Sequence, residues 1–223
     1  MISIRDLYFS YGSNGAFALR VPDLHIGRGE KIAIIGPSGV GKTTLASLIA
    51  GILTPQRGEV VVDGVNLAGA PDHRRRDFRI ANIGFVFQEF ELVDYLPVRD
   101  NILLPYYLNR TLALTPAVRR SAGTLAASMG LGAKLRRYPR TLSQGEKQRV
   151  AICRALATSP KLLIADEPTG NLDPKTSQVI LDLLMEEVRR RRATLVMVTH
   201  NHHLLDAFDR TVDIEAFAEG AAS

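Results

Sequence analysis

The sequence predicts an α/β protein in which apolar strands of a parallel sheet end at polar loops. The apolar run KIAII, at 31–35, leads directly into a glycine-rich loop and then into a helix at about 41–50. A second apolar strand, at 162–165, ends in two acidic residues, as expected at the carboxyl edge of a parallel sheet. The amino-terminal part, at 1–26, is rich in strand patterns.

The loop after the first strand, GPSGVGKT, has the pattern of a phosphate-binding loop. Its glycines let successive backbone N–H groups turn inward around phosphates, and Lys42 adds a positive charge there. The following helix points the positive end of its dipole at the same place, where Thr43 can offer a hydroxyl to Mg²⁺. A chance glycine-rich turn is the alternative, and the strand-loop-helix order argues against it. The predicted nucleotide-binding residues here are Gly36, Pro37, Ser38, Gly39, Val40, Gly41, Lys42, Thr43 and Thr44.

The two acids after the second strand have different expected roles. Asp166 is predicted to hold Mg²⁺ through water, and Glu167 to polarise the water that attacks the γ-phosphate. Acidic pairs are common in loops, so a solvated strand end is the alternative for this pair taken alone.

A second element, LSQGEKQR at 142–149, lies between these motifs, just ahead of the acidic strand. With this order of motifs the chain resembles the nucleotide-binding subunit of an ABC transporter over about 2–213, and an ATPase using ATP and Mg²⁺ is implied. The resemblance implies an α/β P-loop NTPase (RecA-like) core with an amino-terminal antiparallel β subdomain and an inserted α-helical subdomain. It also implies one ABC ATPase domain over 1–223, with the core at about 1–88 and 160–223 and the insertion at 89–159.

Further site residues follow from the resemblance. Tyr11 matches the aromatic residue that stacks on adenine, with Tyr8 as competitor and an ordinary strand aromatic as the alternative for both. Gln88 matches a glutamine that reaches Mg²⁺ and the attacking water, and His200 matches the histidine that contacts the γ-phosphate and orients Glu167. The neighbouring His202 and His203 are expected to be solvated helix residues, and Asn171, Leu172 and Asp173 match a loop that communicates across the dimer.

The second element implies a head-to-tail pair, because in this family it binds ATP held by the other subunit. Ser143 and Gly145 are expected to contact that γ-phosphate, and the partner is a second copy of the chain or a homologous ATPase subunit. The string departs from the common LSGGQ pattern at Gln144 and Glu146. A capped helix without a ligand is the alternative.

Composition agrees with an energy-coupling subunit that reaches the membrane only through a partner. The 223 residues are 46% hydrophobic, yet no run approaches the ~18 apolar residues of a membrane span. The first residues lack the pattern of a signal peptide, so a cytoplasmic location is expected, peripheral on the bacterial inner membrane through integral membrane permease subunits. The single cysteine, Cys153, is expected to be a buried core residue, and the end at 218–223 to be frayed.

The net charge of +5 is modest, and its densest parts are the arginine runs at 74–76 and 189–192. The first run is expected in a polar connector, and the second at the carboxyl end of a helix that begins near Pro174. Neither contains the aromatic residues of a single-strand binding platform. Solvated faces are therefore expected, and no direct nucleic-acid partner.

The string at 87–105, together with ADEPTGNLD, resembles the ATPases of lipoprotein-releasing and macrolide-export systems. Phe90, Leu92, Tyr95 and Leu96 are expected to line a groove for short helices of the permease, with packing inside the insertion as the alternative. An exporter or mechanotransmission role follows. The alternatives are the ATPase of an amino-acid importer, a soluble ABC ATPase acting on ribosomes or DNA, and a phosphate-loop kinase or GTPase.

Overall fold

The computed structural model describes residues 1–12 and 17–218, which form two compact units. One unit joins Met1–Arg79 to the segment that begins at Thr194, and the other is Ile80–Ala193. Residues 219–223, which were predicted to fray, lie outside the described residues.

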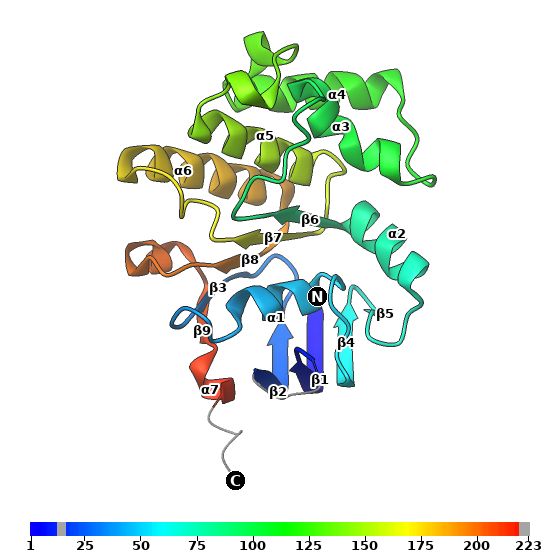
Figure 1. Ribbon diagram of the computed structural model, residues 1–223, viewed down its shortest axis with the longest axis vertical. Coiled ribbons are helices and arrows are strands. Elements are labelled where there is room, and N and C mark those ends of the chain that lie inside the picture. The colour runs from blue at the N-terminus through cyan, green and yellow to red at the C-terminus, as the bar shows by residue number, and fades with distance from the viewer. Residues whose placement is uncertain (13–16, 219–223) are drawn as a thin grey trace. The chain divides into compact units, whose positions relative to one another are not determined.

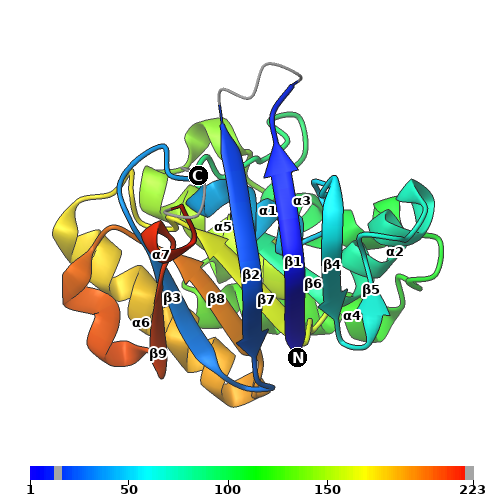
Figure 2. The same cartoon turned by 90° about the horizontal axis from the view of Figure 1, so that it is seen from below.

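An antiparallel sheet forms one part of the first unit, with its strands in the order β2-β1-β4-β5 (Figure 2). The strands are β1 (Ile2–Ser10), β2 (Ala18–Ile26), β4 (Arg57–Val62) and β5 (Val65–Asn66). Strand β1 buries Ile2 and Ile4 before a bulge, and Leu7 and Phe9 after it. The bulge changes which residues face the core, because side chains alternate along a strand.

Parallel strands form the second part of this unit. Strand β3 (Lys31–Ile35) pairs in parallel with β8 (Thr194–Val198) on one side and β9 (Arg210–Asp213) on the other. The buried runs of β3 and β8 are continuous rather than alternating, as expected for strands covered on both faces. The remaining elements of this unit are α1 (Lys42–Ile49), the 3-10 helix η3 (His202–Ala207) and α7 (Glu215–Ala218). Helix α2 (Asp72–Asn82) begins in this unit and ends in the other.

The second unit combines a parallel strand pair with a group of helices (Figure 1). Strands β6 (Ile83–Val86) and β7 (Leu162–Asp166) pair directly, and helix α5 (Gln144–Leu156) contacts β6 and the neighbouring helices. These are α3 (Val98–Leu108), α4 (Pro116–Ser128) and α6 (Pro174–Arg191), with the 3-10 helices η1 (Gly132–Lys134) and η2 (Pro139–Thr141). Nine of the thirteen α5 residues are buried, so α5 is the central helix of this unit.

Most element predictions agree with the structure, with one correction. The arginines at 74–76 lie on helix α2 rather than in a connector, because Asp72 at its start pairs with Arg75 and Arg76 one turn later. Cys153 is fully buried, as predicted. Within the part of the chain that the structure describes, no helix is both long and apolar enough to span a membrane.

Candidate functional site

The phosphate-loop pattern lies between β3 and α1, in the strand-loop-helix order that the sequence predicted. Gly41 caps α1 with a φ of 107°, in the left-handed region, and a Cβ there would lie 2.6 Å from the Phe17 ring. Only glycine fits both restraints. Pro37, Ser38 and Gly39 are exposed, and the loop therefore presents its backbone at the start of the helix.

The Lys42 side chain is held against this loop. It is only 6% exposed, and its Nζ donates hydrogen bonds to the carbonyl oxygens of Gly36 and Pro37 at 2.8 and 2.7 Å. The positive charge is thus fixed at the inner side of the loop, beside the amino end of α1. Both the charge and the helix dipole favour an anion there.

The structure separates the two candidate tyrosines. The Tyr11 hydroxyl lies 3.2 Å from Thr44 Oγ1 on α1, and the Tyr11 ring contacts Phe9 and Phe17. Tyr11 is still 52% exposed, so part of its ring remains open to a ligand.

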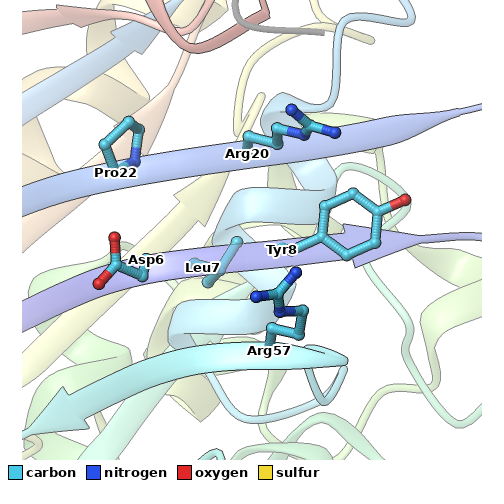
Figure 3. A pocket seen from close by; sticks show the side chains of 6 residues that line it. All are labelled: Asp6, Leu7, Tyr8, Arg20, Pro22 and Arg57. Carbon is cyan, nitrogen blue, oxygen red and sulfur yellow. The ribbon is translucent and has the colours of Figure 1, made fainter.

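Tyr8 lies in a different surface pocket, of about 570 Å³. Figure 3 shows its ring on β1 between Arg20 on β2 and Arg57 on β4. The Arg20 guanidinium lies 5.6 Å from the centre of the Tyr8 ring, at cation-π distance. Cross-strand packing thus accounts for Tyr8, whereas Tyr11 lies beside the phosphate loop.

His200 follows β8 at the same edge of the parallel strands as the phosphate loop. The register pairs Ile34 with Val198, so the loop and His200 both leave the carboxyl ends of paired strands. His200 is exposed, and the turn after it is fixed by a 3.0 Å bond from the Asn201 backbone N–H to Thr199 Oγ1. The side chains of His202 and His203 lie outside the described residues.

In the second unit, β6 and β7 bring Gln88 and the acidic pair to one edge. The parallel register pairs Val86 with Ala165, so Gln88 and Asp166 both follow at the carboxyl ends of these strands. Asp166 is buried and Gln88 is exposed. The Asn171 side chain also donates to the Gln88 carbonyl oxygen at 3.4 Å, which links the two loops.

Glu167 has an unusual backbone conformation, with a φ of 43° in the left-handed region. A non-glycine residue is strained there and needs support from its surroundings, and such residues gather at functional sites. The turn is closed by a 3.0 Å bond from the Gly170 N–H to the Glu167 carbonyl oxygen. The side chain is half-buried.

The start of α5 forms a capping box. The Ser143 Oγ accepts a 3.3 Å bond from the Glu146 N–H, and Glu146 Oε2 accepts a 2.9 Å bond from the Ser143 N–H. The Lys134 ammonium pairs with the other carboxylate oxygen of Glu146. This hydrogen bond holds the pKa of Glu146 below its ordinary value. In this box the Ser143 hydroxyl acts as an acceptor, so its proton remains for a ligand.

The two other positions of this string have plain structural explanations. Gln144 is the first residue of α5, so its backbone is helical and tolerates a side chain. Gly145 is buried, and a Cβ there would lie 2.7 Å from Thr176 Cγ2 on α6. A side chain at 145 would therefore disturb the close packing of α5 on α6.

The structure gathers the predicted site residues into two groups, each inside one unit. Tyr11, the phosphate loop and His200 belong to the first group, and Gln88, the acidic pair and the start of α5 to the second. Sequence reasoning passed over two residues of the second group, Lys134 and Gln148. Gln148 stands inside the LSQGEKQR string, but only its burial distinguishes it from a surface glutamine.

The four residues that were predicted to line a permease groove differ in exposure. Tyr95 is 82% exposed, whereas Phe90, Leu92 and Leu96 are half-buried. The loop beneath Tyr95 is fixed by Asn101, whose amide bonds to both backbone groups of Val93 and to the Leu96 carbonyl. A rigid loop thus presents an exposed aromatic ring.

Comparison with known proteins gives one consistent result. Residues 19–170 match the family model described as ABC transporter. The lipoprotein-releasing system ATP-binding protein LolD of Roseobacter denitrificans is 40% identical over 220 residues, which are 97% of this chain and 96% of that protein. An uncharacterized ABC transporter ATP-binding protein of Methanocaldococcus jannaschii, MJ1508, is also 40% identical, over 92% of this chain and 91% of that protein.

Two solved structures of one protein have the same fold. One is a dimeric post-hydrolysis state of the ATP-binding cassette MJ0796 bound to ADP and Pi, with a TM-score of 0.85 and 32% identity. The other is described as the dimeric structure of MJ0796, a bacterial ABC transporter cassette, with a TM-score of 0.85 and 33% identity. Both alignments cover 96% of this chain and 94% of the other.

Proposed function

The chain belongs to the ABC transporter family as an ATP-hydrolysing subunit, and from this premise we propose that it works as a head-to-tail pair that drives a membrane permease. The observation that supports ATP binding within this proposal is the Lys42 ammonium, fixed against the loop carbonyls at the amino end of α1. A charge in that place, together with the exposed loop, fits the phosphates of ATP.

Within this proposal the first unit binds the nucleotide. The loop residues from Gly36 to Gly41 surround the phosphates with backbone N–H groups, and Lys42 turns from the loop carbonyls to the phosphate oxygens. Tyr11 stacks on adenine, which its position beside Thr44 and its exposed ring support. Thr44 stands one residue after Thr43, where a further phosphate contact is available.

The proposed metal ligands are Thr43, Gln88 and Asp166. Hydroxyl, amide and carboxylate oxygens are the hard ligands that Mg²⁺ prefers, so this donor set fits the ion. Bound Mg²⁺ would neutralise charge on the β- and γ-phosphate oxygens. Asp166 is held at the end of a buried strand, which fixes its carboxylate before any ligand arrives.

The proposed chemistry is attack of water on the γ-phosphorus. Glu167 accepts a proton from that water as the new oxygen–phosphorus bond forms and the bond to the β–γ bridging oxygen breaks. His200 is the proposed hydrogen-bond partner of the γ-phosphate. Positioning and electrostatics carry most of this catalysis, because phosphoryl transfer has a dissociative transition state.

A second copy of the chain is the proposed partner at the α5 element, and a homologous ATPase subunit would serve the same role. The dimeric MJ0796 structures support this assembly. The Ser143 hydroxyl donates to the γ-phosphate of ATP on the partner, and the amino end of α5 adds its dipole. The nearby Lys134 compensates the Glu146 carboxylate, which would otherwise repel that phosphate.

The proposed permease docks on the exposed loop that carries Tyr95. The names of the LolD relatives support a lipoprotein-releasing or similar mechanotransmission role over amino-acid import. Attachment through a permease would place the chain on the cytoplasmic face of the inner membrane. Within the chain, we propose one ABC ATPase domain with the core at about 1–88 and 160–223 and a helical insertion at 89–159.

The alternative of an ATPase that acts on nucleic acid has less support. The arginine runs are partly neutralised, because Arg75 and Arg76 pair with Asp72, and Arg190 and Arg191 pair with Glu187. Such pairing engages these guanidinium groups within their own helices, which leaves fewer of them for phosphate groups.

A Tyr95→Glu variant tests the docking loop. We expect loss of assembly with the permease, because the charge enters an apolar contact, while ATP binding by the isolated chain is unchanged. Tyr107→Glu is a matched control on another exposed tyrosine of the same unit. Permease recovered equally with the Tyr95 variant would count against this docking loop.

The whole proposal is tested by identifying the molecules that accompany this chain in the cell. Tagged Glu167→Gln is purified from native membranes with ATP and Mg²⁺, and the proteins that accompany it are identified by mass spectrometry. A membrane permease among them supports the proposal. Recovery of ribosomes or DNA, or of no companion, would instead favour the soluble class.

A further inference from the structure

We propose that Gln148 is a positioning residue for Glu167, joining the helix that begins at Ser143 to the turn that holds the acidic pair. The inference rests on the proposed function, in which Glu167 is the general base and Ser143 contacts the partner's ATP. Figure 1 shows the elements involved, α5 and the end of β7, within one unit.

The inference is based on a buried hydrogen bond. Gln148 is 0% exposed on α5, and its Nε2 donates to the carbonyl oxygen of Pro168 at 2.5 Å. Pro168 follows Glu167 directly in the chain. The bond therefore fixes the carbonyl group of the residue that follows the proposed base.

The other polar atom of the same side chain is unfavourable for stability. Its Oε1 is buried and has no hydrogen-bond partner among the described residues. An unpaired buried acceptor is unfavourable. An apolar side chain of the same length would avoid this unpaired oxygen, but it would leave the Pro168 carbonyl oxygen without this donor. Turning the amide around would place two oxygens against each other, so the bond to Pro168 also fixes the amide orientation.

Glu167 needs external support because of its left-handed φ of 43°. The Gly170 N–H restrains the Glu167 carbonyl oxygen, and Gln148 restrains the next one. Later in this loop, Ser177 on α6 donates to the carbonyl oxygens of Thr169 and Leu172, each at 3.4 Å. Gln148 on α5 thus restrains the backbone of the residue that directly follows the strained Glu167.

The position of Gln148 along α5 links this restraint to the partner's ATP. Gln148 lies about one helical turn after Gly145, on the same rigid helix whose amino end carries the proposed trans contact. A shift of that end moves the amide and, through Pro168, the backbone of Glu167. Closure of the pair would in this way set the base at the moment when both ATP molecules are bound.

The test replaces the amide without changing its bulk. Full-length Gln148→Met is compared with wild type and with Gln178→Met, a control that removes an exposed glutamine bond to Asp182 on α6. We expect Gln148→Met to lower kcat about 10-fold, the effect of one lost hydrogen bond in the transition state. KM for ATP and the Kd for trinitrophenyl-ATP stay near wild type, because the first unit is untouched. Tm also stays near wild type, because loss of the bond to Pro168 is offset by removal of the unpaired buried Oε1.

A double variant asks whether Gln148 acts through Glu167. Single-turnover hydrolysis by Gln148→Met/Glu167→Gln is expected to equal that of Glu167→Gln alone, because a misplaced base and an absent base have the same effect. A further loss in the double variant would overturn the inference. The inference would also be overturned if the fall in kcat of Gln148→Met were explained by a loss of folded protein, as measured by Tm. The same comparison is made with Gln148→Asn, whose amide is too short to reach Pro168.

Failure of this inference is distinguishable from failure of the proposed function. If wild type hydrolyses ATP, Glu167→Gln does not, and Gln148→Met matches wild type, only the positioning role is wrong. If Glu167→Gln hydrolyses ATP at the wild-type rate, the assignment of the base is wrong, and the positioning role falls with it.

Discussion

Substitution of Gly145 by alanine tests whether helix packing, rather than ATP binding, is the reason for glycine at this position. A methyl group at this position would lie 2.7 Å from Thr176 Cγ2, so either the Thr176 side chain or one of the two helices must shift. Overpacking of this kind costs about 1–3 kcal/mol, and the better helix propensity of alanine returns about 0.5–1 kcal/mol. Gly145→Ala should therefore lose up to about 2.5 kcal/mol of unfolding free energy, with about 1 kcal/mol at mid-range.

The obstructing atom can be removed separately. Thr176→Ser deletes Cγ2 and keeps the hydroxyl, so Gly145→Ala in that background should stabilise the chain by about 0.5–1 kcal/mol. The sign of the substitution effect thus reverses. Thermal unfolding of wild type and the three variants measures it, since 1 kcal/mol corresponds to about 2–4 °C for a chain of this size.

Two results separate packing from ligand binding. If Gly145→Ala is equally destabilising in both backgrounds, contact with Thr176 is not the cause and the reasoning is wrong. If the double variant is stable but hydrolyses ATP poorly, Gly145 also serves the ligand directly. The second outcome would support the proposed contact with the partner's ATP.

Two further predictions concern ionisable groups in the second unit. Burial raises the pKa of Cys153 to about 12, so the native thiol should resist iodoacetamide at pH 8 and react fully in guanidinium; rapid labelling of the native chain would contradict its burial. Lys134 lowers the pKa of Glu146 in the folded chain. The Glu146 carboxylate therefore stabilises the fold at pH values above its unfolded pKa of about 4.3. This stabilisation is lost as the pH falls through the lowered pKa of the folded state. Lys134→Met should therefore shift acid unfolding to higher pH, whereas the control Lys147→Met should not; equal midpoints for the two variants would contradict the pairing.

Much of the fold followed from the sequence because its strands carry strong local signals. The run KIAII and the strand that ends in Asp166 are continuous and apolar, and both were predicted nearly to the residue. The ABC ATPase fold class is confirmed by the TM-score of 0.85 with MJ0796. This prediction was based on the order of the sequence motifs along the chain, since no single motif specifies so large a fold.

Other features depend on contacts that no local pattern records. Arg74–Arg76 looked like a connector, but ion pairs to Asp72 support helix α2. The packing role of Gly145 depends on Thr176, which is distant in sequence. Gln148 is likewise marked only by its burial and by its bond to Pro168, and both require the folded chain.

The central claim is that ATP joins two copies of this chain and that Glu167 then hydrolyses it. The most direct measurement is the mass in solution of purified Glu167→Gln, by light scattering, with ATP and Mg²⁺ and then with ADP and Mg²⁺. A dimer with ATP and a monomer with ADP are expected, because uncleaved ATP holds both phosphate-binding elements together. A monomer under both conditions, at ATP concentrations that saturate binding, would contradict the account.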